Sequence, residues 1–197
     1  MPIYTRTGDK GETSLFGGKR ILKCEELVDV YGSIDELNSW MGLVVTEIID
    51  PDTKNFLQDV QADLFVIGGM LAGWERGGVE NLKVCADDME VRIDIMEEKV
   101  GKLTNFILPG GTKPASHVHI ARAITRRVER QIVKLRHTHV HSPEHQQSWE
   151  HLTKLQWDAI IQYINRLSDL LFQFARFINY DAGIGEIIWS GIPRTKK

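Results

Sequence analysis

The sequence has little cysteine, no long apolar run and no signal segment. Its two cysteines, Cys24 and Cys85, lack a CxxC spacing, which argues against a disulfide framework and indicates a reducing compartment. No apolar stretch approaches the length of a membrane span, and Met1 leads directly into polar sequence without a signal or transit peptide. We therefore expect a cytoplasmic protein that does not enter a membrane.

An excess of charge of one sign is also missing. The chain carries 24 Lys and Arg against 27 Asp and Glu, so its formal net charge is −3, which gives no general attraction to nucleic acid or to an anionic membrane. With 42% hydrophobic residues, a chain of 197 residues can form one continuous core. We expect a single domain over 1–197, with an N-terminal arm (1–24), a helical part (25–180) and a C-terminal tail (181–197).

Apolar residues recur at intervals of three and four along most of the chain, which is the spacing of one helix face. These stripes predict helices over about 27–48, 56–71, 89–103 and 115–136, and a fifth from near Trp149 to Ile178. No stretch alternates between apolar and polar residues, so no strand is predicted. The expected fold class is all-α, an antiparallel five-helix bundle with a glycine-rich N-terminal arm.

The arm between Tyr4 and Lys23 has the composition of an anion-binding loop. It combines glycines, hydroxyls and cations: Gly8, Gly11, Gly17 and Gly18; Thr5, Thr7, Thr13 and Ser14; Arg6, Lys10, Lys19, Arg20 and Lys23. Glycine lets backbone N–H groups approach phosphate oxygens, which the cations neutralise. The spacing fits neither a Walker loop nor a Rossmann fingerprint, so a nucleotide would bind on another architecture. A solvated basic loop has the same composition, and this alternative stays open.

Two predicted helices carry polar faces at helical spacing. The fourth has a cationic face with one carboxylate: Arg122, Arg126, Glu129 and Arg130. Such a stripe suits a polyphosphate, and it is also typical of a solvated helix face. The last helix has a mixed face: Asn165, Asp169, Phe172 and Arg176. An asparagine there can contact phosphate or form a buried polar bridge between helices.

Together with two shorter segments, these stretches form an ordered set of motifs. Besides the arm, the segments are Gly32-Ser-Ile-Asp-Glu-Leu-Asn38, Pro109-Gly-Gly111, Arg122-Ala-Ile-Thr-Arg-Arg-Val-Glu-Arg130 and Asn165-Arg-Leu-Ser-Asp-Leu-Leu-Phe172. The set resembles the motifs of the PduO-type ATP:cob(I)alamin adenosyltransferase family, over about residues 3 to 180. Leu170 departs from that pattern, because a tyrosine is frequent at its position, but no charged group is lost.

The resemblance implies a ferritin-like homotrimer of five-helix bundles, with ATP and a corrinoid bound between neighbouring subunits. Carried over by position, the ATP site comprises Thr5, Thr7, Gly8, Arg20 and Lys23 from the arm, Arg126, Glu129 and Arg130 from the fourth helix, and Asn165 from the fifth. Asp35 and Arg122 match a charge pair between two subunits beside the site. Phe106 matches the aromatic residue below the corrin ring. The catalytic set is thus Arg122, Arg126, Phe106 and Asp35.

The implied reaction is attack of cob(I)alamin cobalt on the 5′-carbon of ATP, which yields adenosylcobalamin and tripolyphosphate. The cations can stabilise the leaving group together with Mg²⁺, and no general base is needed because the nucleophile has no proton to lose. An apolar side chain such as Phe106 would ease reduction of cobalt by displacing its lower ligand. A reductase and an enzyme that accepts the product are the further implied partners, and no protein metal site is predicted.

Other functions fit the sequence less well. A di-iron bundle needs Glu-x-x-His pairs, which the chain lacks. The cationic stretch 122–136 could bind nucleic acid, but the rest of the chain is acidic and has no groove-reading motif. A non-catalytic adenylate sensor or corrinoid chaperone is the leading alternative. The histidines of the connection 137–151 could hold a transition metal or be solvated, and His117 and His119 are expected on a helix surface or at an interface.

Overall fold

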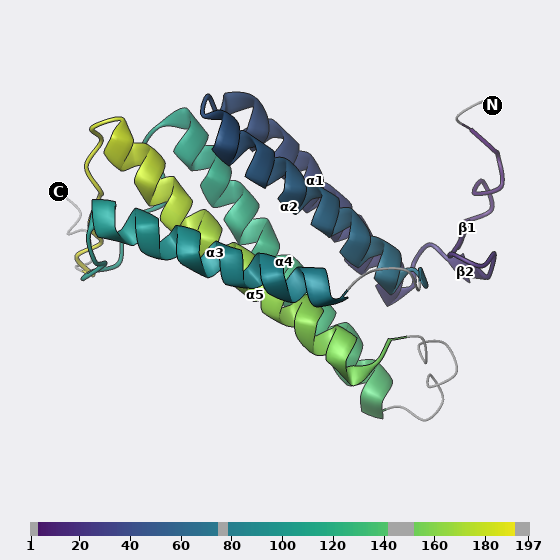
Figure 1. Cartoon of the computed structure of the whole chain (residues 1–197). Coiled ribbons are helices and arrows are strands. Elements are labelled where there is room, and N and C mark those ends of the chain that lie inside the picture. The colour runs from purple at the N-terminus through teal and green to yellow at the C-terminus, as the bar shows by residue number, and fades with distance from the viewer. Residues whose placement is uncertain (1–3, 75–78, 142–151, 192–197) are drawn as a thin grey trace.

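Five long helices lie side by side in the computed structural model of the chain, which describes residues 4–74, 79–141 and 152–191 (Figure 1). The helices are α1 (Glu26–Glu47), α2 (Pro51–Leu71), α3 (Val79–Val100), α4 (Lys113–His141) and α5 (Lys154–Asp181). Two short strands precede them, β1 (Glu12–Ser14) and β2 (Arg20–Leu22). The predicted five-helix bundle is confirmed.

The helix boundaries differ from the prediction where local capping decides them. The Asp50 carboxylate accepts a hydrogen bond of 2.8 Å from the Thr53 N–H, and with Pro51 as the first helical residue this starts α2 earlier than the apolar stripe. Thr153 forms a capping box with Gln156, so α5 starts at Lys154. The predicted start near Trp149 is therefore wrong, and Trp149 itself lies outside the described residues.

The expectation of no strand is also wrong. β1 and β2 pair antiparallel, with Thr13 opposite Ile21, around a turn in which Gly17 and Gly18 have φ angles of 84° and 86°. Glycine adopts these angles without steric cost. Three-residue strands are too short to show an alternating pattern, which explains why the sequence did not reveal them.

A continuous apolar core holds the helices together. α4 packs against α1 and α5, while α2 packs against α1 and α3 against α5. All five helices contribute fully buried side chains: Leu37, Met41, Leu57, Leu64, Ile67, Leu82, Met89, Val128, Ile132, Ile160, Ile164 and Leu171 are among them. Burying such a side chain contributes about 1.5–3 kcal/mol, so this packing dominates the stability of the bundle.

The arm and the tail lie at opposite ends of the bundle. In Figure 1 the purple arm projects beyond the end at which α1 begins, and the described part of the tail, in yellow, follows α5 at the other end. The Phe16 N–H donates to the Ala72 carbonyl at 3.0 Å, which ties the hairpin to the end of α2. None of the described helices combines the length and apolar character needed to span a bilayer.

Candidate functional site

The arm brings together the five residues that sequence analysis assigned to it. The hydroxyls of Thr5 and Thr7 lie 2.8 Å apart, and Nη2 of Arg20 donates to the Thr7 carbonyl at 2.7 Å. A Cβ atom added to Gly8 would lie 3.0 Å from Nζ of Lys23, so the absence of a side chain at Gly8 leaves room for this ammonium group. We call Thr5, Thr7, Gly8, Arg20 and Lys23 the arm cluster.

The hairpin explains why residues so far apart in sequence meet in the arm cluster. Arg20 stands on β2 opposite Ser14 and reaches across the pair to Ser14 Oγ (3.2 Å) and the Glu12 carboxylate (3.2 Å). The Lys23 N–H donates to the Gly11 carbonyl at 2.8 Å, which returns the chain to the start of the loop. The Glu12 contact is an exposed ion pair, so it stabilises little and leaves the guanidinium able to contact an anion.

A second group of predicted residues gathers on α4 and α5. Nδ2 of Asn165 donates to Oε1 of Glu129 at 2.9 Å, which links the two helices. Arg126 precedes Glu129 by three residues and Arg130 follows it directly, so the two arginines lie one turn apart on α4. Both are exposed, and neither has a hydrogen-bond or ion-pair partner within the described residues. We call Arg126, Glu129, Arg130 and Asn165 the helix cluster. It presents two uncompensated cations beside a carboxylate and an amide, which suits a polyphosphate.

The arm cluster and the helix cluster do not meet in one chain. None of the contacts that hold each cluster reaches the other, and the arm projects from the end of the bundle, whereas the helix cluster lies along α4 and α5 (Figure 1).

The predicted charge pair of Asp35 and Arg122 is likewise not formed within the chain. Asp35 is exposed on α1, and Arg122 is half-buried on α4, where its Cζ lies 5.8 Å from the centre of the Phe172 ring. Arg122 Nε is buried without a partner in the described part of the chain. Burial, and secondly the charge of Arg126, lowers the pKa of the Arg122 guanidinium. An unpaired, partly desolvated cation of this kind calls for an anion from outside the chain.

His119, which sequence analysis placed on a helix surface or at an interface, is 95% buried, with 5% of its surface exposed. It lines a cavity of about 500 Å³ together with Arg122 and Pro109. Burial, and secondly the charge of Arg122, lowers the pKa of His119 to about 4, so the ring is neutral at neutral pH. Its Nδ1 atom has no partner among the described residues. His117, two residues earlier and so on a different face of α4, instead pairs with Glu47 at 2.8 Å.

Phe106 stands in the connection between α3 and α4 and contacts the C-terminal tail. Its ring centre lies 6.1 Å from that of Trp189, with the ring planes at 73°, and both side chains are largely exposed, Phe106 at 76%. Two backbone hydrogen bonds of 2.8 Å join the segments, from Leu108 N–H to the Ile187 carbonyl and from Trp189 N–H to the Phe106 carbonyl. The pair forms an exposed apolar surface that could pack against the face of a flat ligand.

The Pro109-Gly-Gly111 turn is held by one side chain of α5. Asn179 donates to the Gly110 carbonyl at 2.8 Å and accepts from the Thr112 N–H at 2.9 Å. A Cβ atom on Gly111 would lie 2.3 Å from Asn179 Oδ1, and its φ angle is 106°, so only glycine fits here. The turn thereby sets where α4 begins relative to Phe106.

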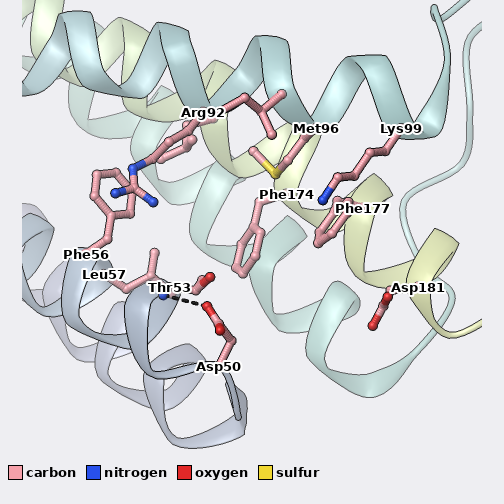
Figure 2. Close-up of a pocket in the computed structure, with 12 residues that line it drawn as sticks. Asp50, Thr53, Phe56, Leu57, Arg92, Met96, Lys99, Phe174, Phe177 and Asp181 are labelled. Atoms are coloured by element: carbon pink, nitrogen blue, oxygen red, sulfur yellow. Dashed lines mark hydrogen bonds between the residues drawn. The ribbon is translucent and has the colours of Figure 1, made fainter.

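A different cavity, of about 450 Å³, lies between α2, α3 and α5 and contains none of the predicted site residues (Figure 2). Two cations cover aromatic rings along it: Arg92 Cζ lies 3.9 Å from the centre of the Phe56 ring, and Lys99 Nζ lies 5.4 Å from that of Phe177. The Arg92 contact joins α2 to α3. These cation–π contacts help to hold the helices together, so the residues along this cavity have a structural role.

No group of three or more His, Cys, Asp or Glu side chains in the described part of the chain could hold a metal ion. Of the histidine-rich connection 137–151, residues up to His141 belong to α4 rather than to a loop. His145 and His151 lie outside the described residues, so the metal alternative there stays a hypothesis.

Comparison with known proteins decides the family. The family model of cobalamin adenosyltransferase matches residues 3–178. The chain belongs to this family. A corrinoid adenosyltransferase from Bacillus subtilis (strain 168) is 40% identical over 193 residues, which cover 95% of this chain and 91% of that relative. The PduO corrinoid adenosyltransferase of Citrobacter freundii is 37% identical over 192 residues, and the chain spans 53% of its length.

Solved structures of cobalamin adenosyltransferases share the fold. A variant of the PduO-type ATP:corrinoid adenosyltransferase from Lactobacillus reuteri, in complex with cobalamin and ATP, has a TM-score of 0.79 at 34% identity. The match covers 96% of this chain and 99% of that chain. Both clusters and Phe106 lie within residues 3–178, which the family model matches. For Asn165, sequence analysis gave a buried polar bridge between helices as one alternative; the structure shows such a bridge to Glu129, but an exposed one. The contact of Phe106 with Trp189 was not predicted, because it joins segments whose proximity only the fold reveals.

Proposed function

We propose that the protein transfers the 5′-deoxyadenosyl group of ATP to the cobalt of cob(I)alamin. The observation that carries this proposal is the family match over residues 3–178, which includes the arm cluster, the helix cluster and Phe106. In the reaction, the cobalt lone pair forms a bond to the ATP 5′-carbon while the carbon–oxygen bond breaks. The bonding pair leaves with tripolyphosphate, and no proton has to move.

The ATP site is shared between two subunits of a homotrimer. The separation of the arm and helix clusters within one chain supports this arrangement, because one copy would supply the arm and the next the cations of α4. Asp35 of one subunit would then pair with Arg122 of its neighbour. The buried, unpartnered Nε atom of Arg122 supports this pairing, since a buried cation without an anion is costly.

The cations act on the leaving group. Arg20 and Lys23 from the arm and Arg126 and Arg130 from α4 bind the phosphates and stabilise the charge that develops when the carbon–oxygen bond breaks. Glu129 and Asn165 limit the excess positive charge and hold the face of α4 in place. Positioning matters as much as charge, because the 5′-carbon must lie in line with the cobalt.

Mg²⁺ would bind mainly to the triphosphate. Mg²⁺ prefers oxygen ligands and commonly binds through phosphates and one or two protein groups. The hydroxyls of Thr5 and Thr7, whose oxygens lie 2.8 Å apart, would be the protein ligands, while the triphosphate would supply the negative charge. When bound, the ion neutralises phosphate charge.

Phe106 acts on the cobalt from below the corrin ring. An exposed aromatic side chain that cannot coordinate cobalt would keep the lower ligand away, which makes the metal easier to reduce. The place of Phe106 beside Trp189 supports this role, because two rings offer a wider apolar surface than one. We further propose a cytoplasmic location, a reductase that supplies electrons and an acceptor enzyme that takes the product.

An anaerobic assay with ATP, Mg²⁺ and chemically reduced cobalamin tests the function. We expect the light-sensitive spectrum of an alkyl-cobalamin together with one tripolyphosphate released for each product formed. ATP binding without tripolyphosphate release would instead support the non-catalytic sensor or corrinoid chaperone.

A further inference from the structure

The C-terminal tail keeps a defined place beside Phe106 although it buries little apolar surface. Ile187 is 61% exposed, Ile188 is 59% exposed and Trp189 is 56% exposed. Since hydrophobic stabilisation follows the apolar area removed from water, side-chain burial contributes little to holding the tail. Polar contacts must therefore set its position.

The backbone contacts of the tail are few. The Ile107–Ile188 bridge and its two hydrogen bonds are the pairing between the tail and the α3–α4 connection. An isolated two-stranded pair is marginally stable in water, so this bridge needs support from elsewhere.

That support comes from Arg176, a buried arginine on α5 that is 3% exposed. Its Nε donates to Oε1 of Glu186 at 2.5 Å, and its Nη2 donates to the Gly101 carbonyl at 3.1 Å. Nη1 donates to Oε1 of Gln173 at 2.9 Å, which fixes the guanidinium on α5. One side chain thus holds both the tail, at Glu186, and the connection that begins at Gly101.

The two anchor points are close in sequence to the aromatic pair. Trp189 follows Glu186 by three residues, which span at most about 10 Å, and Phe106 is five residues beyond Gly101. A fixed anchor at each segment limits where the two rings can stand. Charge-assisted hydrogen bonds of a buried arginine are stronger than ordinary ones, and the planar guanidinium sets direction as well as distance.

We infer that Arg176 and Glu186 are positioning residues for the corrinoid side of the site: their ion pair fixes the tail against the α3–α4 connection and so places Trp189 beside Phe106. The inference rests on the proposed function for its catalytic consequence, but the ion pair itself does not. Neither residue contacts substrate in this role. They act through the tail and through the connection.

Glu186→Gln tests the inference with little risk to folding, because Glu186 lies on the tail outside the helices. The first measurement is hydrogen exchange of the Leu108 and Trp189 backbone amides, which donate the two bridge hydrogen bonds. We expect exchange to become at least about 10-fold faster, because a charge-assisted contact that supports the bridge is weakened. Asp181→Asn is the matched control, since Asp181 is exposed near the same end of α5, and it should leave exchange unchanged.

The second measurement is the electron paramagnetic resonance spectrum of cob(II)alamin with ATP. In Glu186→Gln, most of the signal from four-coordinate cobalt, which has lost its lower ligand, should disappear, and conversion from cob(II)alamin should be slower. The affinity for ATP should stay unchanged. Glu186→Asp should recover part of the signal and part of the conversion rate. A merely stabilising contact would leave this spectrum unaltered.

Each outcome decides between the two proposals. Unchanged amide exchange in Glu186→Gln overturns the inference that the Arg176–Glu186 ion pair fixes the tail. Faster exchange with a wild-type cobalt spectrum overturns the positioning role. A wild-type protein that makes no adenosylcobalamin overturns the proposed function, and with it the catalytic consequence, while the exchange result still decides whether Arg176 and Glu186 hold the tail.

Discussion

Asn165 on α5 donates a hydrogen bond of 2.9 Å to Glu129 on α4, so one amide fixes the only carboxylate of the helix cluster. The bond leaves Arg126 and Arg130 on the same face without an internal carboxylate partner in the described part of the chain. Both cations are therefore available to an external anion, because neither is paired with Glu129. This relationship underlies the first prediction.

Replacing Arg126 or Lys23 with alanine should weaken ATP binding about 10- to 100-fold, because each change removes a charge-assisted contact to phosphate. Isothermal titration of each variant with Mg²⁺ and ATP measures the effect. Lys134→Ala provides a matched control on α4, since Lys134 pairs with Glu26 at 2.8 Å away from the helix cluster. Equal losses in all three variants would point to general electrostatics rather than to a site.

Asp35→Asn should lower activity and shift the assembly toward smaller species, because the half-buried Arg122 would lose its anion from the neighbouring subunit. Sedimentation velocity and the transfer assay measure both effects. Exchanging the two charges, in Asp35→Arg with Arg122→Asp, should recover part of the loss. A fully active monomer would disprove a site shared between subunits.

Phe106→Ala should leave ATP affinity nearly unchanged, because Phe106 belongs to neither the arm cluster nor the helix cluster and contacts the C-terminal tail instead. Conversion should fall most when the assay starts from cob(II)alamin with a mild reductant, since the lower ligand can then return to cobalt. The deficit should shrink with cob(I)alamin, for which reduction is already complete. The same loss from both starting states would mean that Phe106 serves binding rather than reduction.

His119 should make the fold less stable in mild acid. Its pKa is lowered to about 4 in the folded chain from an ordinary value of 6.5, so the unfolded chain binds the proton more readily. The contribution of the neutral His119 ring to the free energy of unfolding is fully present above pH 6.5 and is lost as the pH falls toward 4. At pH 4.5 the loss is about 2 kcal/mol. Urea unfolding at pH 7 and pH 4.5 should show a smaller drop for His119→Gln than for the wild type.

Apolar periodicity was enough to predict the five helices, because stripes such as Leu27 to Ile48 record which face is buried. It was not enough for their ends. Asp50 and the Thr153–Gln156 capping box set two of the starts through side-chain hydrogen bonds that carry no apolar signal. The hairpin was missed for a related reason, since its pairing depends on a glycine turn and not on alternation.

The candidate site was predicted as a set of residues but not as a geometry. The motifs selected both clusters, and the structure brings together the members within each cluster. Asp35 and Arg122 stay apart within the chain, and the proposed pairing would need a second copy, which no property of one chain can position. The ion pair of Arg176 and Glu186 could not be predicted from the sequence, because nothing in the spacing of the two residues distinguishes a buried ion pair from two solvated charges.

The distance between the arm cluster and the helix cluster within one chain has a genetic consequence. In the proposed site shared between subunits, a lesion in the arm, such as Lys23→Ala, and a lesion on α4, such as Arg126→Ala, damage opposite sides. Subunits that carry different lesions can then assemble so that one interface receives an intact arm and an intact α4. Two inactive alleles would in this way restore part of the activity in a mixed population, whereas two alleles damaged on the same side would not.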